Sequence, residues 1–258
     1  MNNNIIDNVR QSFSVQAAEF ENSSMSFSKQ EYLDYVVNSI DFHKEDTVLE
    51  VASGTCACGR AIAPNVLSVT CTDATPAMLE VGKCVAEKDG MTNISFIEAL
   101  AQKLPFENNS FDVVITRLSF HHFENMEKPF AEMKRVLKAG GKLVIIDMEA
   151  TSDEFRETQN EIETMRDFSH IQNRSKAEFE SLFLNNSFEL IRCETTPIKV
   201  ELSSWLQLTN TSDEIQNKIT EIMEADLNSG ANTGFSPYKE NGQIYFNQQW
   251  LFMIGIKE

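Results

Sequence analysis

The first 40 residues of the chain place apolar side chains at helical spacing. Five of them would share one face of a helix: Tyr32, Tyr35, Val36, Val37 and Ile40. Ser28 precedes this stretch and is a residue type that caps helix N-termini. The pattern therefore predicts an N-terminal helical cap over residues 1–40.

Between residues 47 and 147, short β-branched runs alternate with amphipathic stretches of helical spacing. This alternation is typical of βαβ units and predicts an α/β fold with a parallel sheet. The predicted strands are Thr47–Val51, Ser68–Thr72, Ile94–Ile97, Phe111–Thr116 and Lys142–Asp147. The predicted helices are Pro76–Lys88, capped by Thr75, and Glu127–Lys138, ended by Gly140–Gly141.

After residue 147 the pattern loosens. The expected elements are helices at 153–167, 175–185 and 213–228 and strands at 188–196 and Ile244–Ile256. Residues 229–243 are rich in Gly, Asn and Ser and predict a loop. We therefore expect three parts: the cap at 1–40, an α/β core at 41–150, and a region at 151–258 that completes the sheet and adds helical insertions.

The net charge of the chain indicates which classes of binding partner it favours. Its 258 residues include 39 acidic and 22 basic side chains, for a formal net charge of −17. Such a chain repels nucleic acids and anionic membrane surfaces, which favours a small-molecule partner. The N-terminus lacks a secretory signal, and no apolar run approaches the roughly 20 residues of a membrane span. We expect a cytoplasmic monomer or homodimer that binds neither nucleic acid nor membrane.

The five cysteines argue against a disulfide framework or a metal centre. They are odd in number and lie in apolar surroundings, which favours free thiols. Cys56 and Cys58 form a C-x-C pair, but no further Cys or His stands at the spacing of a zinc site. We therefore expect no metal.

The turn after the first predicted strand is the first candidate site. It reads Glu50-x-Ala52-Ser53-Gly54-x-Cys56, so small residues would let a ligand approach the backbone at a helix N-terminus. It is not the G-x-G-x-x-G turn of dinucleotide enzymes. An acid ahead of the turn suits a ligand with an ammonium group. The alternative is an ordinary tight strand-to-helix turn.

Asp73 follows the second predicted strand and is the second candidate. A carboxylate in this place can accept hydrogen bonds from both hydroxyls of an adenosine ribose. Alternatively, Asp73 is a surface acid near a helix N-terminus.

Four segments in order resemble the class I S-adenosylmethionine-dependent methyltransferases, in particular those related to quinone and menaquinone C-methylases. They are the turn at 48–59, the run Asp73–Glu80, the segment Phe96–Phe106, and the stretch from Ser110 to Gly141. The last contains S-F-D-V-V, H-H-F and E-M-K-R-V-L-K-A-G-G, with Ala139 where the family has Pro. The resemblance implies a Rossmann-like fold: a seven-stranded, mostly parallel sheet with an antiparallel last strand, a helical cap and a helical lid.

The resemblance also implies a site for S-adenosylmethionine in the core. Its expected residues are Glu50, Ala52, Ser53, Gly54, Asp73, Ala74, Met78, Leu100, Ala101 and Arg117. Many family members have Asp at the position of Leu100, and that Asp binds the adenine amino group. Here the backbone N–H of Ala101 and an apolar slot would hold the base instead. Arg117 could alternatively bind an anionic group of the methyl acceptor or form an internal salt bridge.

Methyl transfer to oxygen benefits from a base. His121 and Asp147 end two neighbouring strands, and an imidazole oriented by a carboxylate is a common base arrangement. His170 is a second candidate, within the run Glu163-x-x-Arg166-Asp167-x-Ser169-His170 that resembles a narrower subgroup. His121 could instead only pack or hydrogen-bond at the strand-to-helix turn, and His170 could be a loop contact that orders the cap. Aromatic residues that could line a substrate lid, or simply fill the core, are Trp205, Phe235, Tyr238 and Tyr245.

The sequence thus predicts an enzyme that methylates oxygen or carbon of a small molecule, with nitrogen left open. The alternative is a non-catalytic protein that binds S-adenosylmethionine, or another partner, on the same scaffold. A nicotinamide-linked oxidoreductase is disfavoured because the G-x-G-x-x-G turn is missing.

Overall fold

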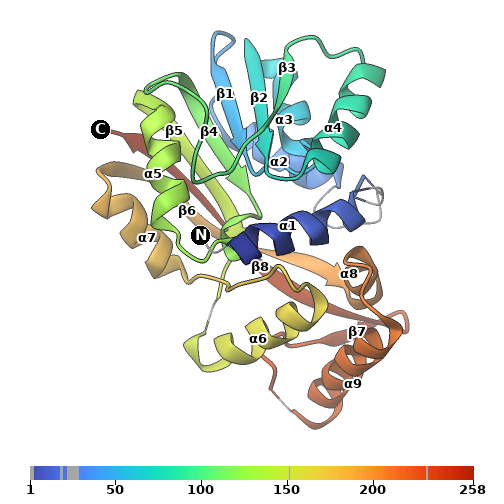
Figure 1. Ribbon diagram of the computed structural model, residues 1–258. Helices are drawn as coiled ribbons and strands as arrows, with labels where there is room; N and C mark the ends of the chain where they lie inside the picture. The colour runs from blue at the N-terminus through green and yellow to red at the C-terminus, as the bar shows by residue number, and fades with distance from the viewer. Residues whose placement is uncertain (1–2, 18–19, 22–28, 151, 231) are drawn as a thin grey trace.

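The computed structural model describes residues 3–17, 20–21, 29–150, 152–230 and 232–258. Within them, one eight-stranded sheet runs through the molecule and carries helices on both faces (Figure 1). The strands are β1 (Thr47–Val51), β2 (Ser68–Asp73), β3 (Ile94–Glu98), β4 (Phe111–Arg117), β5 (Leu137–Met148), β6 (Phe188–Glu201), β7 (Tyr238–Glu240) and β8 (Gln243–Lys257).

The order of the strands is β3-β2-β1-β4-β5-β8-β6, with β7 paired to β8 off this path. Strands β1 to β5 pair in parallel, whereas β8 runs antiparallel to both β5 and β6. This confirms the expected Rossmann-like architecture, with a mostly parallel sheet and an antiparallel last strand.

Strand β7 corrects the prediction of a loop over residues 229–243 and adds an eighth strand to the seven that were predicted. Tyr238–Glu240 pairs with the start of β8 as a hairpin. Asn241 and Gly242 both have positive φ, which is the conformation a two-residue hairpin turn requires. The Asn-Gly pair was the sequence signal for this hairpin.

The helices are α1 (Asn3–Gln16), α2 (Gln30–Ser39), α3 (Ala57–Ile62), α4 (Pro76–Lys88), α5 (Glu127–Val136), α6 (Asp153–Arg166), α7 (Lys176–Asn185), α8 (Leu202–Leu208) and α9 (Asp213–Ser229). Two short 3₁₀ turns cover Ala63–Asn65 and Phe120–His122. Thr75 occupies the N-cap position of α4 with Pro76 in the first turn, as predicted, but its side chain makes no capping hydrogen bond. The predicted cap Ser28 lies outside the described residues.

Two boundaries differ from the sequence prediction. Gly140 and Gly141 do not end a helix but lie inside β5, which begins at Leu137. Leu137 is fully buried and pairs with Phe111, and a register shift in this pairing accommodates the glycines. Strand β6 continues to Glu201 because its pairing with β8 continues beyond residue 196. Helix α8 follows directly and was not predicted.

The core forms on both faces of the sheet because neighbouring strand residues point to opposite sides. On one face, Val48 and Ile115 belong to a buried cluster that includes α2 and α3. On the other face, Leu49 and Val114 pack with the aromatic side chains of α5 and α7. A sheet covered on both faces leaves the ends of its parallel strands as the natural place for a site.

Helix α1 lies across the middle of the molecule, with the parallel strands above it and α6 and α8 below it in Figure 1. The long strands β6 and β8 connect these two regions. In the part of the chain described above, every helix is too short or too polar to span a bilayer.

Candidate active site

A large pocket opens at the carboxyl ends of the parallel strands. Nine of the ten predicted cofactor residues line it, together with His121: Glu50, Ala52, Ser53, Gly54, Asp73, Ala74, Leu100, Ala101 and Arg117. Met78 is fully buried and contributes no surface to the pocket. The topology therefore brings segments far apart in sequence to one cavity.

The turn between β1 and α3 has three residues in left-handed conformation. Ala52, Gly54 and Cys56 have φ of 53°, 55° and 63°. A non-glycine residue in this conformation costs roughly 1–2 kcal/mol. Ala52 and Cys56 stand where the family pattern has glycine. The backbone at both positions nevertheless keeps the conformation that suits glycine. The hydrogen bond from Ser53 N to Thr72 O, 2.9 Å long, ties it to β2.

Glu50 is buried at the end of β1, below this turn. Its Oε2 accepts a hydrogen bond from the backbone N–H of Gly59 at 2.8 Å. Burial raises the pKa of Glu50 to about 7, against the opposing charge of Arg117. A Cβ on Gly59 would lie 2.6 Å from Oε2, so glycine is needed for this contact. The guanidinium of Arg117 also lies over the indole of Trp250, 5.9 Å from the ring centroid, and both residues line the pocket.

The raised pKa of Glu50 predicts a pH dependence of stability. Because the folded state binds this proton more tightly than the unfolded state, the stability it provides is present at low pH. That stability is lost as the pH rises from the ordinary pKa of a glutamate, 4.5, through about 7, and the loss amounts to about 3 kcal/mol in all. In Glu50→Gln we expect most of this loss to disappear. Melting temperatures of both proteins across this range test it; parallel curves would contradict the assignment.

Asp73 is held at the mouth of β1 and β2 by backbone N–H groups. Its Oδ2 accepts a hydrogen bond from Gly54 at 2.9 Å, and its Oδ1 accepts one from Thr75 at 2.8 Å. Burial raises the pKa of Asp73, although these hydrogen bonds oppose the rise. The carboxylate is therefore fixed in orientation on the wall of the pocket, and each oxygen retains a lone pair for a further donor.

His121 and Asp147 form a buried pair at the ends of β4 and β5. Nδ1 of His121 lies 2.6 Å from Oδ1 of Asp147. Oδ2 of Asp147 accepts hydrogen bonds from the backbone N–H groups of Ser119 and Phe120, at 2.8 and 2.6 Å. Burial alone would raise the pKa of Asp147, but His121 and these donors hold it below its ordinary value.

The backbone before His121 is strained in a way that serves this pair. Leu118 has a φ of 54°, which a bulky side chain rarely adopts. Just beyond Leu118, the N–H groups of Ser119 and Phe120 both reach Oδ2 of Asp147, so Oδ1 is left for the imidazole. With Nδ1 bound, Nε2 is the His121 nitrogen that has no hydrogen-bond partner among the described residues. His121 lines the pocket, so this nitrogen can serve a ligand there.

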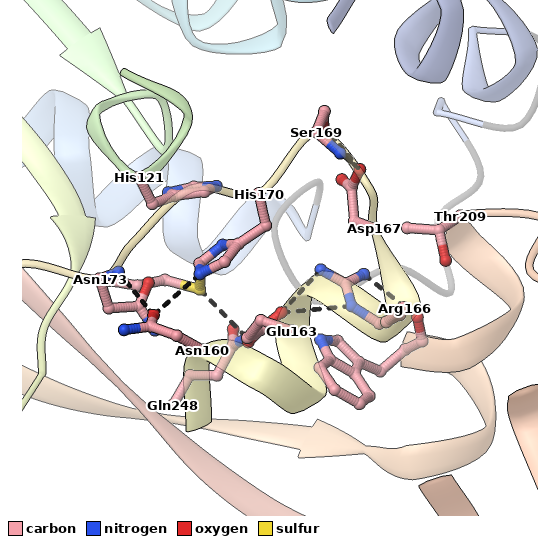
Figure 2. Close-up of polar contacts among 12 residues, drawn as sticks. His121, Asn160, Glu163, Arg166, Asp167, Ser169, His170, Asn173, Thr209 and Gln248 are labelled. Carbon is pink, nitrogen blue, oxygen red and sulfur yellow. Dashed lines mark hydrogen bonds and ion pairs between the residues drawn. The ribbon is translucent and has the colours of Figure 1, made fainter. Parts of the chain in front are cut away.

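The position of His170 does not support the prediction that it acts on the substrate. Its ring stacks on His121 with centroids 5.6 Å apart, but it contributes no surface to the pocket (Figure 2). Nε2 of His170 lies 2.9 Å from Oδ1 of Asn160. Burial lowers the pKa of His170 to about 2 and keeps it neutral. His170 therefore packs against the ring of His121 on the side away from the pocket lining.

The end of α6 and the turn after β4 supply pocket residues that sequence reasoning missed. Arg166 and Asp167 line the pocket, and so does His122. Oδ1 of Asp167 accepts hydrogen bonds from Ser12 of α1 and from Ser169. Burial would raise the pKa of Asp167, but nearby His122 and Arg166 and the hydrogen bonds of Ser169 lower it to about 2. The run containing Arg166 and Asp167 was the available signal.

The aromatic residues proposed for a lid divide into two groups. Trp205 lines the pocket, together with Trp250 of β8, which was not among the predicted site residues. Phe235 packs against Trp205 and Phe246 in the core. Tyr238 and Tyr245 stack on each other in the terminal hairpin, away from the pocket. Among the described residues, no group of three or more His, Cys, Asp or Glu side chains could hold a metal ion.

Comparison with known proteins agrees with this geometry. Residues 49–145 match a family model described as a methyltransferase domain. The chain is 27% identical over 242 residues to the uncharacterized methyltransferase YcgJ of Bacillus subtilis, covering 93% of this chain and 96% of that protein. The crystal structure of YcgJ matches with a TM-score of 0.79 over 88% of this chain and 98% of that chain.

Two further relatives are informative. Demethylmenaquinone methyltransferase of Renibacterium salmoninarum is 36% identical over 143 residues, which are 55% of this chain and 58% of that protein. A phosphoethanolamine N-methyltransferase of Haemonchus contortus, solved with S-adenosylhomocysteine, shares the fold with a TM-score of 0.68 at 18% identity, covering 98% of this chain and 60% of that chain. The chain belongs to the class I S-adenosylmethionine-dependent methyltransferases and is an enzyme of that family.

Proposed function

We propose that this enzyme transfers a methyl group from S-adenosylmethionine to an oxygen or carbon atom of a small molecule, with His121 as the base. The observation that carries the proposal is the pair of His121 and Asp147, whose 2.6 Å contact leaves Nε2 of His121 at the pocket. An imidazole held in one tautomer by a buried carboxylate is suited to take a proton from a hydroxyl group.

The residues around the first turn fit the methyl donor. Asp73 would accept hydrogen bonds from the ribose hydroxyls, because its carboxylate lines the pocket and is already oriented by Gly54 and Thr75. Glu50 would face the amino acid end of the cofactor, and Leu100 and Ala101 would border the adenine. When bound, S-adenosylmethionine supplies a methyl group on a positively charged sulfur.

His121 would act at the hydroxyl group of the methyl acceptor. Nε2 takes the hydroxyl proton, and Asp147 stabilises the resulting imidazolium. The electron pair left on oxygen, or on a carbon conjugated with it, forms the new bond to the methyl carbon. S-adenosylmethionine, when bound, would supply that methyl carbon and keep the electron pair of the broken carbon–sulfur bond on its sulfur. Holding the acceptor in line is the other contribution of the pocket.

The departures from the family pattern do not weaken this proposal. Ala52 and Cys56 keep the left-handed backbone that glycine would have. A non-catalytic role would also leave the oriented base at the pocket without a purpose. The acidic chain, with its net charge of −17, supports a small-molecule substrate and neither nucleic acid nor an anionic membrane. We further infer a cytoplasmic enzyme that acts as a monomer or homodimer.

Incubation with a metabolite extract and S-adenosylmethionine labelled on its methyl group tests the proposal. We expect mass spectrometry to find a new labelled metabolite with the methyl group on oxygen or carbon. The His121→Ala protein, added at equal concentration, is the matched control and should leave that metabolite nearly absent. A label found only on nitrogen, or formed equally by both proteins, would refute the proposed reaction.

A further inference from the structure

Beyond His121, the pocket is bounded by a wall made of Arg166, Asp167, Trp205, Gln248 and Trp250, which we call the acceptor wall. Arg166 is the cation among these five residues, and it is already paired: it donates through Nη2 to Oε2 of Glu163 at 3.0 Å. Only 1% of Glu163 is exposed, so this is a buried ion pair behind the wall. Figure 2 shows Arg166 between Glu163 and Asp167. The wall therefore offers no uncompensated positive charge.

The two indoles of the wall are not available to a cationic ligand. The guanidinium of Arg166 lies over Trp205, 4.4 Å from its centroid, and that of Arg117 lies 5.9 Å from the centroid of Trp250. An aromatic face binds an ammonium group when the cation approaches that face. Here each indole already carries a cation of the protein, which would repel a second one.

An anionic ligand is disfavoured for the opposite reason. Asp167 lies on the wall itself, and its pKa of about 2 keeps it charged at neutral pH. Its Oδ1 is occupied by Ser12 and Ser169, so it attracts no further donor there. The positive charge of Arg166, which could have offset a ligand anion, is neutralised by Glu163. A second anion beside Asp167 would meet repulsion from its negative charge.

The wall nevertheless offers hydrogen-bond donors. Nε1 of Trp205 is buried and has no hydrogen-bond partner within the described ranges. Arg166 has five N–H groups, and its bonds to Glu163 and to the backbone oxygen of Trp205 leave others unused. Buried donors without a partner cost free energy, which a ligand oxygen recovers. A neutral carbonyl oxygen satisfies donors without adding charge.

We propose that the methyl acceptor binds as an uncharged planar compound, with a hydroxyl group at Nε2 of His121 and a carbonyl oxygen at Arg166 and Trp205. This inference rests on the proposed function, in which His121 takes the hydroxyl proton. Trp205 and Trp250 favour a flat acceptor because both present aromatic surface to the pocket. Arg166 and Glu163 together are then specificity residues: the first binds the carbonyl group and the second cancels its charge.

Three phenols of similar size test the charge preference: neutral 4-hydroxyacetophenone, anionic 4-hydroxybenzoate and cationic tyramine. Calorimetry would measure their binding to protein saturated with S-adenosylhomocysteine, near neutral pH. We expect the ketone to bind at least about tenfold more tightly than either charged phenol. Equal or tighter binding of a charged phenol overturns the proposal, and so does binding of none of the three. Loss of S-adenosylhomocysteine binding would instead contradict the proposed function.

Two variants distinguish an effect of charge on ligand selectivity from damage to the fold. In Glu163→Gln the carboxylate that pairs with Arg166 is gone, so we expect 4-hydroxybenzoate to gain about tenfold in affinity and to bind about as tightly as the ketone. In the double variant Glu163→Gln/Arg166→Gln both charges are gone, and the preference for the ketone over the charged phenols should return. Unchanged selectivity in the single variant overturns the proposal. Should a variant fail to bind S-adenosylhomocysteine, the three-phenol comparison on the unaltered protein decides alone.

Discussion

Replacing His121 by Ala is expected to lower kcat for methyl transfer by about 10²–10⁴-fold, the usual contribution of a general base. The pocket keeps its shape, because Asp147 still accepts hydrogen bonds from Ser119, Phe120 and Met148. Binding of S-adenosylhomocysteine, measured by calorimetry, should therefore change little. The loss should be confined to kcat and not to affinity for the methyl donor.

Further measurements keep this expectation specific to proton transfer. His121→Gln, whose side chain can hydrogen-bond but cannot take up a proton, should lose as much kcat as His121→Ala. His43→Ala, which removes a histidine outside the pocket in the loop before β1, is the matched control and should retain full activity. A His121→Ala enzyme with nearly normal kcat would show that the pair with Asp147 is only structural.

Asp147 should be less replaceable than its absence from the pocket lining suggests. It accepts four hydrogen bonds: one from His121 and three from backbone N–H groups. In Asp147→Asn, the amide nitrogen must face at least one of these donors, so the arrangement of His121 cannot survive unchanged. The oriented imidazole is therefore a property of the turn as a whole, including the strained Leu118.

The parallel core was predictable from local pattern because each of its strands is a short β-branched run between turn residues. The same reasoning failed where pairing, not propensity, sets the boundary. Leu137 begins a strand because it pairs with Phe111, and the extension of β6 to Glu201 depends on β8. Such long-range pairings leave no trace in the spacing of nearby residues.

The residues of the site likewise divide into those that local pattern predicts and those that only tertiary packing brings together. Motif residues such as Asp73 and His121 were found because each follows a strand whose end must lie at one edge of the sheet. The acceptor wall was missed because it is assembled from α6, α8 and β8, which meet only through tertiary packing. The position of His170 behind His121 was not predictable, because a sequence cannot show which of two stacked imidazoles faces a cavity.

Replacing Asp73 by Asn is expected to weaken binding of S-adenosylhomocysteine by about 100-fold. The carboxylate has one lone pair on each oxygen left for the two ribose hydroxyls, and hydrogen bonds to a charged group contribute roughly 1.5–3 kcal/mol each. Asparagine keeps the shape but has only one oxygen, which the N–H group of Gly54 or Thr75 would claim. Calorimetry with purified protein measures the change in Kd directly.

Asp112→Asn is the matched control. Its Oδ2 also accepts a backbone N–H, from Thr47 at 2.9 Å, but Asp112 lies outside the pocket. This variant should lower the melting temperature and leave the Kd unchanged. The sharper comparison uses S-adenosylhomocysteine that lacks the 2′-hydroxyl group. The unaltered protein should bind this analogue more weakly than the complete ligand, whereas Asp73→Asn should bind the two ligands nearly equally. If both proteins lose affinity equally when this hydroxyl is removed, Asp73 does not hold the ribose and the cofactor lies elsewhere in the pocket.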